Sequence, residues 1–352
     1  MGTSQSQDSH SGYLYIETLT AFFRSGSELQ GTVHLYLTQP VHAQELVLKF
    51  KTKEKWIINP NPNGTYAQFK TMVIRPQFFA EKTTISHRFP IFRFSGEVTG
   101  PGQFSFPFTL KLPANVPGSC NIDDRICIGH ITSHLIASVI STGETVRKFH
   151  LPLVIMQTFS QSLHSEQTFA VSKGCCGGTG LVAITAAVDK NSYMPGEEIG
   201  ISVEIDNSAG CVPIRSVTVG LYRIIDVAMV TGAAFIRKSI EKEMVMRRQI
   251  PVGQALLAER KVHLRLPVNV NPATVSAKGQ TMQCFYTVNV CAQLEKGWLF
   301  GSSDPILSHR VIVQPVEPVF LAPPTIAVAW NPEVLPVTLL SLGDNYDGVN
   351  VS

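Results

Sequence analysis

Four lysines recur at every second position near the start of the chain. They are Lys49, Lys51, Lys53 and Lys55, with one residue between each pair. Successive side chains of a β-strand point to opposite faces, so an unbroken strand would carry all four ammonium groups on one face. Such a stripe would suit phosphorylated peptide tails or anionic lipid headgroups, each lysine contributing about 1 kcal/mol near an acidic leaflet. The alternatives are a solvated outer face, or an edge strand that its lysines protect from aggregation.

Two other stretches could carry a lipid. Gly2, with Ser6 after it, matches the N-myristoylation pattern, although a polar tail could match it by accident. A single myristoyl chain gives only marginal membrane binding, so the lysines would supply the second signal. Cys175 and Cys176 lie in a glycine-rich stretch and are candidates for palmitoylation or redox chemistry. The alternative for this pair is two small buried thiols.

The sequence offers little for catalysis or metal binding. His130 and His134 have the spacing of a zinc pair, but Ile131 stands where a helical metalloprotease motif requires Glu. The chain has no Gly-x-Ser-x-Gly elbow, no phosphate-binding Walker loop and no Cys-x-x-Cys pair. We therefore expect a protein that is not an enzyme, with no metal site and no cofactor.

The length, the net charge and the apolar runs of the chain exclude several classes of protein. A chain of 352 residues suits two domains rather than one sandwich. A net charge of +3 with 16% charged residues is too balanced for general nucleic-acid binding. The longest apolar runs fall far short of the roughly 20 residues of a spanning helix. Seven cysteines, an odd number, and no apolar leader at the N-terminus favour reduced thiols and a cytoplasmic location.

One stretch combines a turn signal with a strand signal and then recurs. Pro195-Gly196 predicts a turn, and the apolar residues at 199, 201, 203 and 205 predict a strand with one buried face. The same pattern begins at Gly26, 170 positions before Gly196. A second shared block relates residues 108–117 to residues 262–271 at an offset of 154. Two blocks in the same order predict a duplicated β domain.

We therefore predict an all-β fold of two Ig-like antiparallel β-sandwich domains packed in tandem. The expected segments are a disordered N-terminal stretch at 1–12, a first sandwich at 13–158, an interdomain linker at 159–180, a second sandwich at 181–316 and a proline-rich tail at 317–352. The prolines after residue 314 leave few backbone donors, so we expect the tail to stay out of the sheets.

Three stretches resemble the arrestin superfamily, most closely the arrestin-domain-containing proteins called α-arrestins. They are residues 31–37 followed by Pro40, residues 102–108 followed by Leu112-Pro113, and residues 190–207 with their Tyr-x-Pro-Gly-Glu core. Cys175-Cys176, just before the second domain, is also similar to that family. The resemblance covers about residues 13–313. It implies a non-catalytic cytosolic adaptor that links membrane cargo to endocytic or endosomal trafficking machinery at the plasma membrane or endosomes.

The tail departs from that family. Many α-arrestins recruit ubiquitin ligases through Pro-Pro-x-Tyr, but here Pro323-Pro324-Thr325 is followed by Ile326. Leu339, Leu340 and Leu342 resemble a clathrin-box peptide whose acidic residue comes one place late. The alternative is an apolar tail strand that docks on its own domain.

Two alternatives to the adaptor stay open. One is a retromer-like structural subunit of a membrane coat, which would form permanent complexes. The other is a module that binds anionic lipid without cargo. The expected partners are therefore cargo tails, trafficking machinery of clathrin or ubiquitin-ligase type and an anionic membrane surface, with no nucleic acid.

Overall fold

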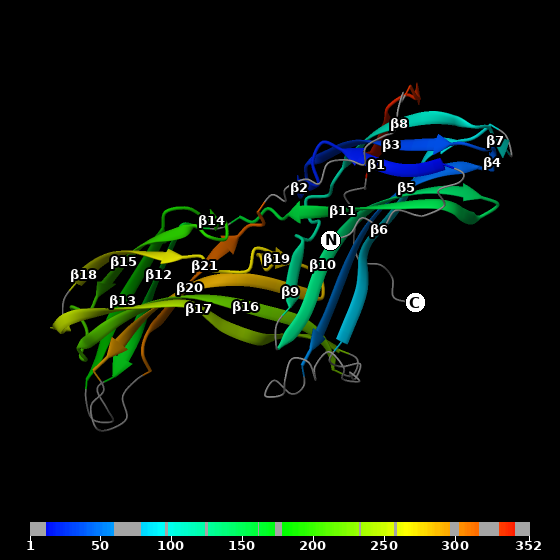
Figure 1. The fold of residues 1–352 in the computed structure, drawn as a ribbon. Helices are drawn as coiled ribbons and strands as arrows, with labels where there is room; N and C mark the ends of the chain where they lie inside the picture. Colours follow the sequence, from blue (N-terminus) through cyan, green and yellow to red (C-terminus); the bar gives the residue numbers. More distant parts are fainter. Residues whose placement is uncertain are drawn as a thin grey trace. The chain divides into compact units, whose positions relative to one another are not determined.

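The computed structural model divides the chain into two compact units, and no residue that it describes is helical. The first unit comprises Met1–Thr158, Gly279–Thr281 and Glu317–Ser352, and the second comprises Phe159–Lys278 and Met282–Val316. The predicted all-β fold class is confirmed (Figure 1). The structure describes residues 12–59, 79–95, 98–123, 126–160, 162–172, 178–231, 234–256, 259–295, 303–316 and 331–341.

The smaller sheet of the first unit has the order β1-β3-β8-β22, with β23 also paired to β8. β1 and β3 are antiparallel, as are β3 and β8, whereas β22 and β23 run parallel to β8. The bounds of its strands are β1 (Gly12–Thr18), β3 (Glu28–Leu37), β8 (Gly102–Lys111), β22 (Glu333–Val334) and β23 (Thr338–Ser341).

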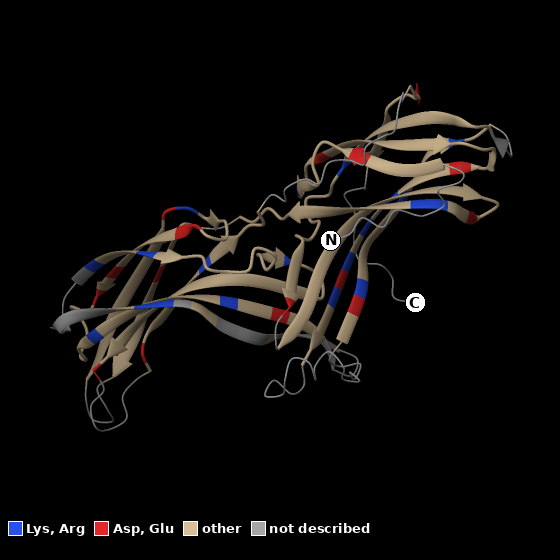
Figure 2. Cartoon of the chain, viewed as in Figure 1, with Lys and Arg blue, Asp and Glu red and all other residues tan. Residues whose placement is uncertain are grey.

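The larger sheet of the first unit has the order β2-β11-β10-β5-β6, with β9 paired to β10. Its strands are β2 (Phe22–Arg24), β5 (Glu45–Ile58), β6 (Phe79–Arg93), β9 (Cys120–Asp123), β10 (Cys127–Ser141) and β11 (Glu144–Met156). A separate short pair joins β4 (Val41–His42) to β7 (Val98–Thr99). Bands of Lys and Arg lie along β5 and β6 in Figure 2.

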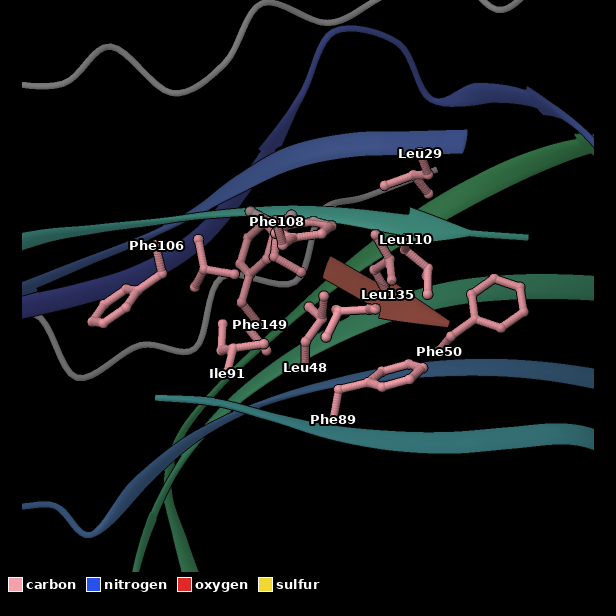
Figure 3. Packing of buried hydrophobic residues seen from close by; sticks show 14 of the residues in the cluster. Leu29, Leu48, Phe50, Phe89, Ile91, Phe106, Phe108, Leu110, Leu135 and Phe149 are labelled. Carbon is pink, nitrogen blue, oxygen red and sulfur yellow. The ribbon is translucent and has the colours of Figure 1, made fainter. Parts of the chain in front are cut away.

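The core of the first unit lies between its two sheets. Leu29 of β3 and Phe108 of β8 face Phe50 of β5 and Leu135 of β10, and all four side chains are at most 1% exposed. Figure 3 shows these side chains converging from the two layers. On β5 the buried positions alternate with half-buried ones from Leu48 onward, which leaves the lysines on the outer face. The core therefore fixes which way the lysines point.

The second unit also contains two sheets. The first has the order β12-β13-β15-β18 and the second β14-β21-β20-β16-β17, with β19 paired to β20. The strands of the first are β12 (His164–Ser172), β13 (Thr179–Val188), β15 (Glu198–Asp206) and β18 (Glu259–Pro267). Those of the second are β14 (Ser192–Tyr193), β16 (Ile214–Thr231), β17 (Ala234–Leu256), β19 (Ala277–Lys278), β20 (Met282–Leu294) and β21 (Ile306–Val313).

The predicted linker at 159–180 is wrong for its middle part. Residues His164–Ser172 form β12, which pairs along its whole length with β13. Most of its side chains are exposed, and only Val171 is fully buried. A polar edge strand gives almost no hydrophobic signal, which is why its composition indicates a linker.

Each of the two units contains the same tight turn, as the internal repeat predicts. Gly26 and Gly196 have φ values of +81° and +90°, in the region that favours glycine. The amide of Gly26 donates to the carbonyl of Pro113 at 3.0 Å, and the amide of Gly196 donates to that of Val268 at 2.9 Å. β2 pairs in parallel with β11, and β14 does so with β21. The same backbone turn therefore opens both sandwiches.

The expectation that the proline-rich tail stays out of the sheets is also wrong. β22 and β23 pair with β8, and the amide of Leu335 donates to the carbonyl of Ser105 at 3.0 Å. Leu340 is 9% exposed and joins the core cluster, while Leu339 is 80% exposed. Proline removes only its own donor, so neighbouring residues can still pair. β22 lies between Pro332 and Pro336, and β23 follows Pro336.

One buried carboxylate interrupts the apolar side of β5. Glu54 is fully buried and accepts hydrogen bonds from the amides of Gln280 and Thr281 at 2.8 and 2.7 Å, and from the Thr281 hydroxyl at 2.9 Å. A Cβ on Gly279 would lie 2.5 Å from this carboxylate and would have to displace it. Buried charge is tolerated only with such partners.

Candidate functional site

The predicted lysine stripe lies on the outer face of the larger sheet in the first unit. Lys49, Lys51, Lys53 and Lys55 are all half-buried, and the residues between them are buried. β5 is flanked by β10 on one side and β6 on the other, so the lysines stand between two further rows of side chains. Those rows decide what the lysines can bind.

The strand register places more cations and two histidines on the same face. Lys49 lies opposite Arg88 of β6 and opposite Ile136 of β10, and Ile136 in turn lies opposite His150 of β11. Two residues further along β5, on the same face, Lys51 lies opposite His134. Directly opposed residues of an antiparallel pair point to the same face.

These residues line a cavity of about 450 Å³. We call it the basic groove and define it by its charged and titratable lining, which is Lys49, Lys51, Lys53, Arg88, His134, Lys148 and His150. Val47, Ile136, Ser138, Ile140 and Thr145 complete its walls, and none of the lining residues is acidic. Its volume is that of a small-ligand pocket.

Two acidic residues neutralise part of this charge. Glu81 of β6 pairs with Lys53 at 3.1 Å and with Lys55 at 3.7 Å, and Glu45 pairs with Arg88. Within the part of the chain that the structure describes, Lys49, Lys51 and Lys148 have no ion-pair partner. The groove therefore keeps three uncompensated cations. Lys55 lies outside its lining.

The cations of the groove lower the pKa values of Lys51 and of both histidines. Burial lowers the pKa of Lys51, and Lys53, Lys49 and Lys148 lower it further, while Glu81 acts in the opposite direction. Burial also lowers the pKa of His134, with Lys51 and Lys53 adding to the effect. For His150 the causes of a lowered pKa are burial, then Lys148, His134 and Lys51. An anion in the groove would relieve this repulsion.

Known proteins show similarity over part or most of the chain. Residues 178–318 match the family model described as "Arrestin (or S-antigen), C-terminal domain". This stretch of the chain is similar to an arrestin C-terminal domain. It is 19% identical over 277 residues to Arrestin domain-containing protein A of Dictyostelium discoideum, covering 75% of this chain and 46% of that protein. It is 23% identical over 216 residues to human Arrestin domain-containing protein 5, covering 58% of this chain and 61% of that protein.

These matches confirm the resemblance to the arrestin superfamily that the motifs predict. The chain spans about half of the length of one relative and about three fifths of the other. The Tyr-x-Pro-Gly-Glu motif lies inside the matched residues 178–318 and has a structural role there. The Tyr193 hydroxyl donates to Asp189 at 2.6 Å, and the Glu197 carboxylate accepts from the amide of Met194 at 2.7 Å.

Several predicted site residues lie outside the described residues. They are Gly2, Cys175, Cys176 and Leu342. Leu339 and Leu340 belong to β23, so the described part of the clathrin-box-like motif is a strand on β8, as the alternative expected. Within the described part of the chain, no group of three or more metal-binding side chains occurs, and no helix is long and apolar enough to cross a membrane.

Sequence reasoning missed Arg88, Lys148 and His150, and it considered His134 only as a metal ligand. Lys148 and His150 do show a signal, because they are two positions apart on one strand. Their distance from Lys51 along the chain hides the shared face, since only the pairing of β10 with β5 and β11 brings them together.

A second polar cluster lies on the smaller sheet. His34 contacts the Ser105 hydroxyl through Nδ1 at 2.9 Å and the Glu17 carboxylate through Nε2 at 2.8 Å. This order of acid, imidazole and hydroxyl is that of a nucleophile relay. However, Ser105 is 4% exposed and His34 is 7% exposed, and Tyr15 stacks on the imidazole at 4.5 Å. A substrate cannot reach a hydroxyl so enclosed, so we interpret the cluster as structural.

Proposed function

We propose that this chain is a non-catalytic arrestin-type adaptor that links membrane cargo to endocytic or endosomal trafficking machinery. The basic groove is its contact for anionic groups on that cargo or its membrane. The observation that carries the proposal is the gathering of five fixed cations and two histidines around one cavity, with no acidic residue in its lining. The arrestin C-terminal domain and the two arrestin-domain relatives support the adaptor class.

Physical chemistry favours binding over catalysis at this groove. Three lysines without ion-pair partners cost free energy when no anion is bound, because like charges at short range repel one another, and Lys49 and Lys148 both lower the pKa of Lys51. A phosphate or sulfate ester would convert that repulsion into charge-assisted hydrogen bonds. The cavity walls also include Val47, Ile136 and Ile140, which would contact an apolar backbone between anionic groups.

Proximity labelling in cells tests the proposal. The chain fused to a labelling enzyme is compared with a groove variant, Lys49→Ala/Lys51→Ala/Lys148→Ala. A control, Lys111→Ala/Lys261→Ala/Lys278→Ala, removes the same charge from other strands. We expect the wild type and the control to label membrane proteins and coat or sorting proteins, and the groove variant to lose most of them. An identical labelled set for all three chains would overturn the proposal.

Co-purification and vesicle binding of the same chains separate the alternatives. A retromer-like coat subunit would purify in a stable stoichiometric complex that the groove variant retains. A lipid-binding module would bind vesicles of anionic lipid fully without any membrane protein. Labelling with the variant Gly2→Ala tests acylation. If Gly2 is acylated, this variant should label fewer membrane proteins than the wild type.

A further inference from the structure

The two histidines of the basic groove are placed to act on a bound anion. The ring centroids of His134 and His150 are 6.5 Å apart with an interplanar angle of 78°, and both rings line the cavity. They extend from neighbouring strands, β10 and β11, on the outer face of the sheet. A ligand that reaches Lys51 therefore also meets both imidazoles.

The charged groups around the two rings are nearly all positive. On β5 these are Lys49, Lys51 and Lys53, on β6 Arg88, and on β11 Lys148. On β5 and β6, the carboxylates of Glu45 and Glu81 pair with Arg88 and Lys53. Nothing in the groove itself stabilises a protonated histidine, so each imidazole gains a proton readily only when a negative charge enters.

We infer that the basic groove is an acid-strengthened site for a small anion that carries several phosphate groups, with His134 and His150 as its proton-dependent ligands. The inference deepens the proposed function and rests on its anion-binding surface. Two ligands have this chemistry. One is a soluble ring that carries several phosphates, and the other is the same ring as the headgroup of a lipid. The cavity of about 450 Å³ admits one such ring, and five fixed cations match its charge.

The direction of the pH effect follows from the environment of the rings. The pKa values of both histidines are lowered by burial and by the surrounding lysines, so both rings are neutral at pH 7.5 in the empty groove. A bound polyanion raises both values. Binding then takes up protons, and each proton taken up strengthens binding by up to about tenfold per pH unit within the shifted range.

The test measures the affinity of the full chain for two probes at pH 7.5, 6.5 and 5.5. Inositol hexakisphosphate is one probe. Inositol hexakissulfate is the other, because sulfate esters keep their charge in this range whereas phosphate monoesters gain protons near pH 6. For the sulfate probe we expect the dissociation constant to fall by at least about tenfold from pH 7.5 to pH 5.5.

The variant His134→Gln/His150→Gln isolates the imidazoles. It should bind the sulfate probe no more tightly than the wild type at any pH, and its affinity should change less than about twofold between pH 7.5 and pH 5.5. His164→Gln, which alters an exposed histidine of the second unit, is the matched control and should keep the full pH dependence. A pH dependence that survives in the double variant would overturn the inference.

A measurement on the wild type guards against misfolded variants. NMR titration of the histidine ring protons should show two imidazoles whose pKa rises when the sulfate probe is added, and unchanged values would also contradict the inference. Vesicles with phosphatidylinositol 4,5-bisphosphate, compared with phosphatidylserine vesicles of equal charge, distinguish a lipid-borne ring from a soluble one. If anion binding is acid-strengthened but proximity labelling finds no cargo, the adaptor proposal fails and this inference stands.

Discussion

The imidazoles of His134 and His150 lie 6.5 Å apart on neighbouring strands, and Lys51 lowers the pKa of both. This relationship joins three strands, since His134 lies on β10, His150 on β11 and Lys51 on β5. The outer face of this sheet is thus one electrostatic unit.

Removing one groove lysine should stabilise the empty protein slightly. Lys51→Gln removes a cation whose neighbours repel it, so we expect the free energy of unfolding to rise by up to about 0.5 kcal/mol at low salt. The gain should vanish at high ionic strength because salt screens the repulsion. Urea unfolding at 20 mM and 500 mM salt measures it, and a loss of stability at low salt would contradict the repulsion argument.

Acidification should destabilise the chain. The pKa values of His34, His130, His134, His150 and His309 are all lowered, in each case mainly by burial. The unfolded chain therefore holds more protons than the folded one as pH falls through the ordinary value of 6.5. The free energy of unfolding should decrease from pH 7.5 toward pH 5.5, until the lowered folded values are passed.

His34 provides a control for that pH effect. His34→Gln removes one of the five groups, so its unfolding free energy should depend less steeply on pH than that of the wild type. Equal slopes for the two chains in urea titrations would mean that the imidazole between Glu17 and Ser105 does not contribute.

Because the same turn occurs at Gly26 and Gly196, replacing either glycine should lower the free energy of unfolding by a similar amount. Gly26→Ala and Gly196→Ala place a Cβ at φ values of +81° and +90°, and each should destabilise the chain by about 1–2 kcal/mol. A new Cβ at 196 meets no atom within 4 Å, and at 26 it makes only ordinary contacts with Ala114. The cost is therefore backbone strain. Thermal unfolding measures it, and Gly100→Ala, which also meets no atom within 4 Å and has no positive φ, should cost much less.

The two leucines of β23 should behave differently. Leu340→Ala removes a side chain from the core and should weaken the attachment of the tail by about 2 kcal/mol, whereas Leu339→Ala changes an exposed side chain. Limited proteolysis reports the difference, because a released tail is cut faster. Equal cleavage rates for the two variants would mean that β23 is not held by its buried face.

Local sequence patterns predicted where the strands lie better than they predicted which strands pair with one another. Alternation at Ile199, Ile201 and Val203 predicted β15, because a half-buried strand must alternate. β12 was missed, since a mostly exposed edge strand has no apolar period. The parallel pairing of β22 and β23 with β8 was missed because it joins segments more than 200 residues apart.

The candidate site was predictable only in part. Lys49, Lys51 and Lys53 share a face by their spacing alone, and that face is outward as expected. Lys148 and His150 reach the same face through the register of β11 with β10, which no single strand encodes. The burial of Glu54 depends on Gln280 and Thr281, and no local signal near residue 54 indicates them.

The most direct measurement is the affinity for inositol hexakissulfate at pH 7.5 of three chains. They are the wild type, Lys49→Ala/Lys51→Ala/Lys148→Ala, and the control Lys111→Ala/Lys261→Ala/Lys278→Ala. The account predicts that the groove variant binds at least about tenfold more weakly than the other two, because each lost charge-assisted contact contributes about 1 kcal/mol or more. Equal affinity of all three chains would contradict the claim that this face of the sheet binds anions.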